Sequence, residues 1–467
     1  MSTQQKPLSL PRVLAFASVG IPLAAVGLPM SVFVAPMYSE QLGLGTAMVG
    51  LILMILRFWD LATDPIMGWL VDAKPTAKGR VKHWILGSVP VLMLGGFFVF
   101  IPFGETVSPL YLGFWLAVLW LGFTMLQTPY AAWVPMIAAD YDDRSRLFLW
   151  REILNTGTLI ALLIIPTVLA LAADFGRRDQ VLVMGVILLI SLPLTVALAS
   201  WTVPDVPPDP DDDPVRFSWP AVKSALTDPA VIRLLSVEIL IGIAIAATGS
   251  TFLFAAKDGF GVDALAPMIL LIYFIAGFAC MPLWTWLSRK TDKHIAVIAV
   301  GLWNSITFFI YLPLSLSGGG LVLLSIGALV TGLAYGSAPI LMRSMLADII
   351  ERERVATGES RAGLYYSLNS AAYKVGASFG IGIPYILLEW LAGYRPGAEN
   401  GPAEISGLMW VFVGVPVVAY GLTALILRAY PVTRETEAAI QAHMVNPTSD
   451  HATTSPSVDT ASDTSKS

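Results

Sequence analysis

Hydrophobic residues along this chain form long runs that are separated by short polar stretches. A helix needs about 20 apolar residues to cross the hydrocarbon core of a bilayer. Roughly twelve segments reach that length, and they lie near residues 12–38, 47–71, 84–103, 108–137, 150–173, 181–202, 231–256, 264–288, 295–316, 320–346, 363–391 and 405–429. The pattern predicts an all-α membrane protein with twelve transmembrane helices in two six-helix bundles.

The longest internal polar stretch, residues 204–228, separates the two sets of spans. It contains Pro207, Pro208 and Pro210 among aspartates, a composition typical of a solvated linker. The end of the chain is rich in Ser, Thr and Asp, which predicts disorder. We therefore expect an N-terminus (1–11), an N-terminal bundle (12–203), a linker (204–228), a C-terminal bundle (229–430) and a disordered tail (431–467).

Lysine and arginine gather in the loops on one side of the predicted bundles. Lys78, Arg80 and Lys82 follow the second span, and Arg289 and Lys290 follow the eighth. Cytoplasmic loops of membrane proteins carry such an excess of basic residues. Both termini and the linker are therefore predicted to be cytoplasmic, in a multi-pass protein of the cell inner membrane.

Composition narrows the class of protein further. Of 467 residues, 56% are hydrophobic and 13% are charged, whereas a soluble domain carries roughly 25% charged residues. One cysteine and four histidines argue against a disulfide framework and against a metal centre, and the net charge of −5 argues against nucleic acid. Neither a nucleophile elbow nor a Gly-x4-Gly-Lys loop is found, so we expect neither an enzyme nor an ATP-driven pump.

An internal repeat supports the division into two halves. Residues 136–146, which include Asp140, resemble residues 345–354, which include Asp348, and each segment follows the fourth span of its half. Duplicated bundles with a site at their interface are typical of secondary transporters. Chance similarity between charge-rich segments is the alternative.

Three charged residues share one face of the second span. Arg57, Asp60 and Asp64 are spaced i, i+3, i+7, and each charge inside a membrane costs at least ~2.5–3.5 kcal/mol on insertion scales. Two carboxylates one turn apart suit a monovalent cation or a shared proton, and Arg57 would hold the empty face near neutrality. A structural Arg57–Asp60 pair is the alternative, but it leaves Asp64 without a partner.

The eleventh span carries Lys374, whose ammonium must face a carboxylate or a water-filled cavity. Asp60 and Asp64 are the expected partners across the interface between the halves. Candidate solute-binding groups surround these positions: Tyr366, Asn369 and Tyr373 on the same span, Gln127, Tyr130 and Trp133 on the fourth span, and Arg151 on the fifth. Aromatic faces with an amide and a guanidinium suit a sugar-like or anionic solute.

Other polar positions have different explanations. Trp133 could equally anchor its helix at the membrane interface, and Glu238 is an intramembrane carboxylate for which the sequence names no partner. Asp72 lies beside the basic residues Arg80 and Lys82 in the loop after the second span. With Asp140 and Asp348 they are predicted to form loop contacts that break when the two halves rock.

The motif Arg57-Phe-Trp-Asp60-Leu-Ala-Thr-Asp64-Pro-Ile-Met-Gly68 resembles the second helix of the glycoside–pentoside–hexuronide:cation symporters, the melibiose permease group of the major facilitator superfamily. The resemblance continues at residues 78–86, 129–135, 345–348 and 366–374. It implies the major facilitator fold and alternating access. It also implies a site for Na⁺, Li⁺ or H⁺ at Asp60, Asp64 and Thr124, with Lys374 beside it and Arg151 as the functional arginine of the fifth span.

Two departures from that family concern the solute. The sugar-binding aspartates of the first and fourth spans fall on Ala24 and Gln127 here, so two carboxylates that would bind sugar hydroxyls are missing. We expect a monomeric cation:solute symporter for a sugar, glycoside or related small polar solute, with Na⁺ or H⁺ as the coupling ion. Transport of an anionic, amphipathic or lipid-like solute, export, and a non-transporting scaffold are the alternatives.

Overall fold

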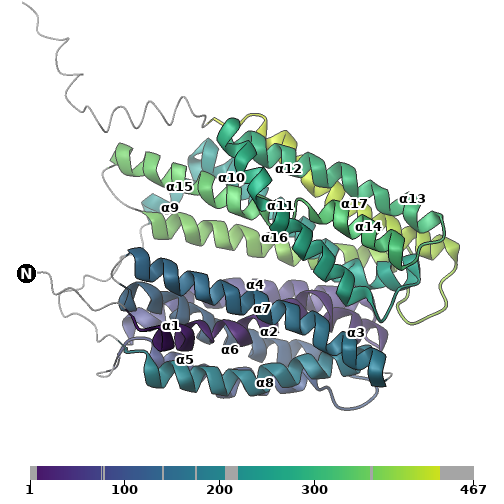
Figure 1. Cartoon of the computed structure of the whole chain (residues 1–467), viewed down its shortest axis with the longest axis horizontal. Helices are drawn as coiled ribbons and strands as arrows, with labels where there is room; N and C mark the ends of the chain where they lie inside the picture. The colour runs from purple at the N-terminus through teal and green to yellow at the C-terminus, as the bar shows by residue number, and fades with distance from the viewer. Residues whose placement is uncertain are drawn as a thin grey trace, which may run out of the picture.

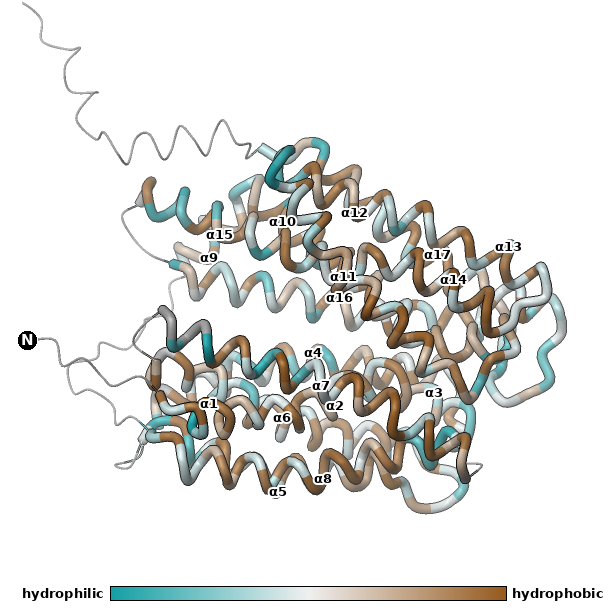
Figure 2. Tube along the Cα trace, viewed as in Figure 1, coloured by the Kyte–Doolittle hydropathy of each residue, from teal (hydrophilic) through white to brown (hydrophobic). Residues whose placement is uncertain are grey.

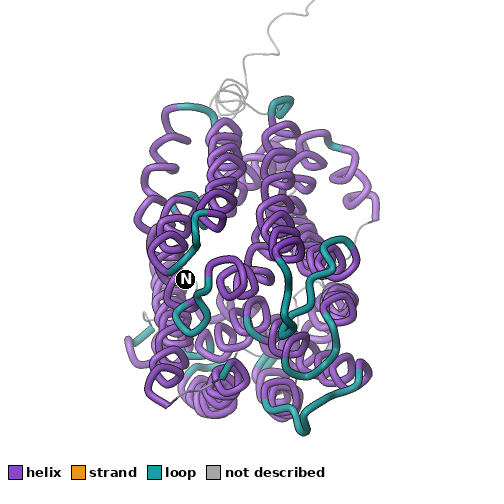
Figure 3. Tube along the Cα trace, turned by 90° about the vertical axis from the view of Figure 1, so that its right-hand side faces the viewer, coloured by secondary structure: helices purple, strands orange, loops and turns teal. Residues whose placement is uncertain are grey.

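Helices make up all the regular structure in the part of the chain that the computed structural model describes, which is residues 8–74, 76, 79–138, 141–173, 176–205, 219–357 and 361–431. Figure 3 shows helices and connecting loops only. The elements before residue 205 are α1 (Leu10–Ala17), α2 (Gly20–Val32), α3 (Val34–Glu40), α4 (Thr46–Ala73), α5 (Lys82–Phe100), α6 (Pro109–Ile137), α7 (Tyr141–Ala173) and α8 (Arg177–Thr202).

A short helix, α9 (Trp219–Thr227), precedes the second half of the chain. The elements that follow are α10 (Pro229–Phe254), the π-helical turn η1 (Ala255–Gly259), α11 (Ala266–Lys290), α12 (Lys293–Thr307), the 3₁₀ turn η2 (Phe308–Ile310), α13 (Tyr311–Leu316), α14 (Leu321–Gly332), α15 (Ser337–Thr357), α16 (Ala362–Trp390) and α17 (Pro402–Leu427).

The prediction of twelve membrane-spanning helices is confirmed. Twelve stretches of the described residues are long and apolar enough to cross a bilayer, and hydrophobic residues follow the lengths of the helices while polar residues collect toward their ends (Figure 2). The first predicted span is broken into α1, α2 and α3. The polar stretch 204–228, predicted as a linker, also contains helix α9. The residues that α9 buries are Ala221, Val222 and Ala225. The predicted tail lies outside the described residues after 431.

Two bundles, α1–α8 and α10–α17, lie one beside the other (Figure 1). Their ribbons converge at the end of the molecule that carries α3, called the Glu40 end below, and separate toward the end that carries residue 8. One continuous apolar core joins the first bundle to parts of α10, α11, α16 and α17. A second core, around Leu234, Met342 and Leu346, lies within the second bundle alone. Apolar packing thus joins the halves toward the Glu40 end.

Helix starts are fixed by local polar groups. Asp228 accepts a hydrogen bond from the amide of Ala230 at 2.7 Å, and Pro229 occupies the first turn of α10, where its missing N–H costs nothing. Ser108 accepts from the amide of Tyr111 at 3.2 Å to begin α6. The carboxylate of Asp205 accepts from the amide of Lys82 at 3.0 Å, which satisfies the exposed first turn of α5.

Candidate cation and solute sites

A cluster of four charged side chains lies where α4 meets α16. The carboxylates of Asp60 and Asp64 project from one face of α4, as the i, i+4 spacing predicts. Lys374 Nζ on α16 lies 2.8 Å from Asp60 Oδ2 and also contacts Asp64 Oδ2. Arg57 lies 3.7 Å from Asp60 Oδ2. The structure thus places Lys374 beside both aspartates, the partners that the sequence analysis expected.

The hydroxyl of Thr124 on α6 completes the cluster. Its oxygen lies 3.1 Å from Asp60 Oδ1 and 3.2 Å from Asp64 Oδ1, so it bridges the two carboxylates. Thr63, which the sequence analysis did not select, lies 3.5 Å from the Thr124 hydroxyl and is buried. Four carboxylate oxygens and one hydroxyl oxygen therefore belong to this cluster, and oxygen atoms are the ligands that hard cations prefer.

Charges within this cluster balance. Arg57 and Lys374 contribute two positive charges and Asp60 and Asp64 contribute two negative ones, so the group is neutral. Ionised side chains in a bilayer persist because they pair with each other, and removing one partner of a buried pair costs about 3–5 kcal/mol. The Asp60 side chain is 1% exposed and that of Asp64 is 34% exposed, so an ion can reach the cluster from the Asp64 side.

Arg57 makes a second contact, with Trp120 on α6. The guanidinium carbon of Arg57 lies 4.1 Å from the centre of the Trp120 ring, within the range of a cation–π interaction. The sequence analysis missed this contact because Trp120 is on another helix. Arg57 therefore has two partners, while Lys374 depends on the two aspartates.

A cavity of about 310 Å³ lies beside the charged cluster, between the two bundles. Arg57, Tyr373 and Lys374 line it, together with apolar and aromatic side chains such as Phe252 and Phe274. Smaller apolar space continues from Phe274 to Leu159 and Phe278, between α7 and α11. The cavity thus combines two cationic groups with predominantly apolar walls, and of the predicted solute-binding residues Tyr373 lies in it.

A second cavity of about 310 Å³ lies within the first bundle, among α2, α6 and α7. Gln127, Tyr130 and Arg151, all predicted solute-binding residues, line it. Glu152 and Asn155, which the sequence analysis did not select, add a carboxylate and an amide. This cavity is therefore the more polar of the two, and the guanidinium of Arg151 lies 6.0 Å from the centre of the Tyr130 ring.

The two cavities follow each other along the same helices. Leu23 lines the polar cavity and Gly27 lines the central one, a single turn further along α2. Asn155 and Leu159 are related in the same way on α7. An elongated solute lying against α2 and α7 would therefore meet polar groups at one end and aromatic groups at the other.

The remaining predicted solute-binding residues lie elsewhere. Trp133 is buried and its indole N–H donates to the carbonyl of Pro204 at 2.9 Å, so it fastens α6 to the end of α8. Tyr366 is 48% exposed on α16 and does not line either cavity. Asn369 is buried, and its side-chain amide interacts with Glu238 on α10, the carboxylate for which the sequence named no partner.

The predicted loop contacts are placed in part. Asp348 accepts hydrogen bonds from Lys293 at 2.5 and 2.6 Å, which joins α15 to α12 within one bundle. The backbone amides of Arg80 and Lys82 donate to Asp205, which lies at the start of the polar stretch 204–228. Asp140 and the side chain of Asp72 lie outside the described part of the chain.

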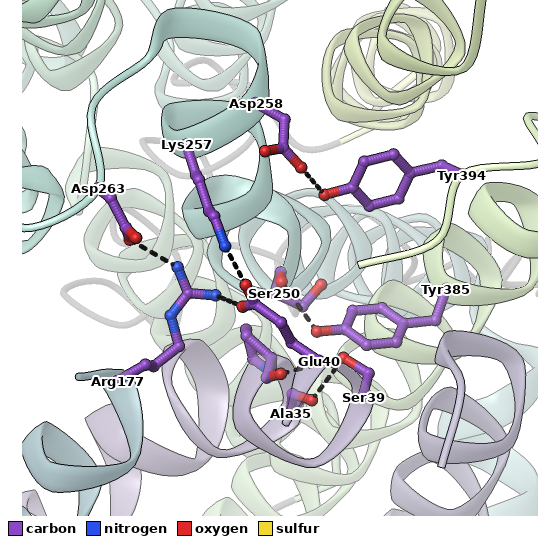
Figure 4. A network of polar contacts seen from close by, with 11 residues as sticks. Ala35, Ser39, Glu40, Arg177, Ser250, Lys257, Asp258, Asp263, Tyr385 and Tyr394 are labelled. Carbon is purple, nitrogen blue, oxygen red and sulfur yellow. Dashed lines mark hydrogen bonds and ion pairs between the residues drawn. The ribbon is translucent and has the colours of Figure 1, made fainter. Parts of the chain in front are cut away.

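A second group of ionised side chains closes the Glu40 end (Figure 4). Glu40, at the end of α3, accepts hydrogen bonds from Arg177 at 2.5 Å and from Lys257 of η1. Arg177 also donates to Asp263 at 2.9 Å. The side chains of Glu40 and Arg177 are 8% and 7% exposed. Two buried residues of the first bundle thus bind two residues of the second, of which Asp263 is exposed and Lys257 is partly exposed.

Neighbouring contacts reinforce this closure. Glu389 on α16 accepts from the amide of Ala47 at 2.7 Å and from the hydroxyl of Thr46 at 3.1 Å, at the positive N-terminus of α4. Tyr394 donates to Asp258 (Figure 4), and burial, with that hydrogen bond, raises the pKa of Tyr394 far above its usual range. The sequence analysis did not pair these residues.

Solved structures with the same fold are transporters of the major facilitator type. The nucleoside transporter NupG superposes with a TM-score of 0.65 at 14% identity, over 91% of this chain and 100% of NupG. A structure of a proton-dependent oligopeptide transporter gives a TM-score of 0.63 at 12% identity, over 92% of this chain and 99% of the other. These likenesses establish the predicted fold.

Sequence comparison gives the family. Residues 15–434 match the family described as MFS/sugar transport protein, and the chain belongs to that family, as its resemblance to the glycoside–pentoside–hexuronide symporters predicted. It is therefore a membrane transporter of a small solute with twelve spans.

Relatives within the family are named for different solutes. The sodium-dependent lysophosphatidylcholine symporter 1 of Gallus gallus is 23% identical, over 92% of this chain and 88% of the relative. The isoprimeverose transporter of Lactiplantibacillus pentosus is also 23% identical, over 87% of this chain and 85% of the relative. A sphingosine-1-phosphate transporter of Xenopus tropicalis is 24% identical, over 83% of this chain and 81% of the relative. Family membership thus leaves both sugars and lipids as solutes.

Proposed function

We propose that this protein is a cation-coupled symporter that moves an amphipathic solute by alternating access. The observation that supports the proposal most strongly is the position of Lys374, whose ammonium contacts both aspartates of α4 from the opposite bundle. A group that occupies the oxygens a cation needs is a built-in competitor for that cation. Coupling then follows from exchange between the two.

Exchange at this cluster changes the charge of the central cavity. A Na⁺ ion or a proton at Asp60, Asp64 and Thr124 would displace Lys374, because the ammonium and the cation need the same oxygens. The neutral group of four side chains then gains one positive charge. Since Lys374 lines the cavity with Arg57, the excess charge is offset when a solute brings an anionic group. Binding of the cation and of the solute are therefore mutually favourable, as linkage requires.

The walls of the cavities indicate the rest of the solute. Aromatic side chains of α10 and α11, such as Phe252 and Tyr273, suit an apolar body. Arg151 and Gln127 suit a polar group about one helical turn away. The family includes relatives named for lysophosphatidylcholine and for sphingosine-1-phosphate. An amphipathic anion or zwitterion fits these groups best.

A neutral glycoside is the second candidate. An amide, a guanidinium and a carboxylate line the polar cavity, from Gln127, Arg151 and Glu152, and such groups can hydrogen-bond sugar hydroxyls. The relative named for isoprimeverose supports this reading. Ala24 and Gln127 stand in place of two expected carboxylates, which favours the first candidate over the second.

The conformation described here corresponds to one stage of the transport cycle. Polar contacts and apolar core join the halves at the Glu40 end. Together with the proposed cytoplasmic location of both termini, these contacts support a state that is closed to the outside and open to the cell interior. Breaking the contacts of Glu40 would let the halves rock to the opposite state, with the cation and the solute bound near the middle.

A binding screen tests the proposal. The protein in lipid nanodiscs is heated with a free pentose, an aryl glycoside or a short-chain lysophospholipid, with and without Na⁺ at several fixed pH values. We expect the amphipathic compound to raise the unfolding temperature more when Na⁺ or protons are supplied, and Lys374→Gln to remove that dependence. Stabilisation by the free sugar alone, unaffected by either cation, would contradict both parts of the proposal.

A further inference from the structure

A second carboxyl group lies inside the membrane-spanning part of the protein, away from the α4 cluster. Glu238 is on α10, and the amide of Asn369 on α16 interacts with it. The exposed fractions of these residues are 5% and 8%, and Val237 and Ile241 beside Glu238 belong to the apolar core of the second bundle. Neither residue lines the two cavities described above.

Hydrogen-bond pairing of this acid and amide is incomplete. The side-chain amide of Asn369 interacts with the Glu238 carboxyl across the α10–α16 contact. Glu238 Oε2 and Asn369 Oδ1, however, have no hydrogen-bond partner among the described residues. Both atoms are acceptors, so a donor is what the pair lacks, and buried polar atoms of this kind are ordinarily paired. A proton on Glu238 creates an O–H group that supplies it, since a carboxylic acid and a carboxamide form two complementary hydrogen bonds.

A metal cation fits this place poorly. Na⁺-type ions need several oxygen ligands, and here one carboxyl and one amide oxygen are available. Arg343 on α15 also acts on Glu238 electrostatically, and its positive charge opposes any added cation, a proton included. A proton needs one oxygen and leaves the carboxyl neutral, which an apolar surrounding favours.

Charged and titratable groups near Glu238 come from few helices. Arg343 faces it from α15, and Tyr373 interacts with it from α16. Tyr420 on α17 acts on Tyr373, and α2 carries no ionisable residue. Lys257 and Asp258 of η1 are at the opposite end of the same span.

Close packing fixes the position of the pair. A Cβ atom built on Gly376 would lie 2.1 Å from the carbonyl oxygen of Ile239, and one on Gly242 would lie 2.6 Å from that of Tyr373. The backbones of α10 and α16 therefore touch one turn beyond Glu238. A change in the charge of Glu238 cannot be absorbed by loose side chains and acts on the two helices directly.

Tyr373 connects this pair with the central cavity. It lies one turn beyond Asn369 on α16, next to Lys374, and it interacts with both Arg57 and Glu238. It also lines the central cavity. The protonation state of Glu238 thus reaches the groups that bind the cation and the solute through a single helix.

We infer that Glu238 is a second ion-coupling site, which binds a proton in a carboxylic acid–amide pair with Asn369 while the first ion binds between Asp60 and Asp64. The transporter then carries a proton-sensitive step that persists when the first site is filled with Na⁺. The existence of the second site does not depend on which ion fills the first.

Infrared difference spectroscopy of the full chain in nanodiscs, between mildly acidic and mildly alkaline buffer at saturating Na⁺, tests this assignment. We expect a carbonyl band of a protonated carboxyl that is lost in Glu238→Gln and retained in the double variant Asp60→Asn, Asp64→Asn. In Asn369→Leu the band should move to higher frequency, because its carbonyl loses the amide donor. A spectrum that is the same in Glu238→Gln as in the parent protein overturns the assignment.

A functional readout separates a proton site from a structural pair. Protein on a supported membrane at saturating Na⁺ is subjected to a pH jump, and the displaced charge is recorded. We expect Glu238→Gln to lose at least half of this charge while keeping its response to a Na⁺ jump, which reports the first site. Equal pH-driven charge in Glu238→Gln and in the parent protein counts against a proton at Glu238, whatever happens at Asp60.

Discussion

Lys374 Nζ on α16 lies 2.8 Å from Asp60 Oδ2 on α4, and the same ammonium contacts Asp64. One side chain of the second bundle thus fills the oxygen cluster of the first. The contact joins the two halves near the middle of the molecule, beside a cavity that both halves line. A cation that replaces the ammonium changes at once the link between the halves and the charge presented to a solute.

Replacing Lys374 with glutamine tests the competition between ammonium and cation. Without Na⁺, Lys374→Gln leaves two carboxylates with Arg57 alone, and we expect a loss of about 3 kcal/mol in unfolding free energy, the low end for a broken buried pair because Asp64 is partly exposed. Na⁺ affinity should rise about tenfold, which corresponds to about 1.4 kcal/mol. Thermal unfolding across a Na⁺ titration measures both.

Lys290→Gln is the matched control, because Lys290 is exposed at the end of α11 and lies over Trp286. It should leave Na⁺ affinity unchanged. Weaker Na⁺ binding in Lys374→Gln than in the parent protein would show that Lys374 assists the ion instead of competing with it.

The contacts that close the Glu40 end predict that breaking them makes the central cavity more accessible from outside. Glu40→Gln removes the charge that pairs with Arg177 and Lys257, and breaking a buried pair costs about 3–5 kcal/mol. We expect a cysteine placed at Ser31, which lines the central cavity, to react faster with an impermeant thiol reagent added from outside. Cys280 is first replaced with alanine so that one thiol remains.

Glu105→Gln serves as the control for this experiment, since Glu105 is exposed in the loop between α5 and α6. It should leave the reaction rate of the Ser31 cysteine as it was. An unchanged rate in Glu40→Gln as well would mean that the Glu40 contacts do not hold the halves together.

Glycine at the α10–α16 contact predicts a packing effect. Gly376→Ala forces a methyl group against the carbonyl of Ile239, and overpacking of this kind costs about 1–3 kcal/mol. Gly414→Ala on α17 meets nothing within 4 Å and should be neutral or stabilising, because alanine favours a helix by about 0.5–1 kcal/mol over glycine. Unfolding temperatures that fall equally in both variants would argue against the close contact.

The spacing of residues along a helix explains which site residues could be predicted from the sequence. Arg57, Asp60 and Asp64 stay on one face because seven residues make nearly two helical turns, and their charge inside a span demands a partner, which led to Lys374. Thr124, Gln127, Tyr130 and Trp133 are spaced by three, and each step falls about 60° short of a turn. The series therefore rotates from the cation cluster through the polar cavity to Pro204.

Contacts between distant segments left no local signal. Glu40, Arg177, Lys257 and Asp263 come from four separate helix ends or loops, and only tertiary packing brings them together. Two further features were missed for a related reason, namely the break within the first span and the helix α9. Apolar runs and proline-rich stretches predict the lengths of spans and linkers, while breaks and short helices depend on packing against neighbouring helices. The interaction of Asn369 with Glu238 became visible once α16 was placed against α10.

Charge displacement after a cation jump tests the central claim, that Asp60 and Asp64 bind the coupling ion, most directly and needs no solute. Purified protein on a supported membrane is exposed to a step in Na⁺ at constant pH and, separately, to a step in pH at constant Na⁺. We expect at least one step to displace charge in the parent protein and in Glu404→Gln. In Asp60→Asn and in Asp64→Asn, the charge displaced by the Na⁺ step should be abolished. The charge displaced by the pH step should fall to the part that protonation of Glu238 contributes. Full responses in both variants would contradict the account.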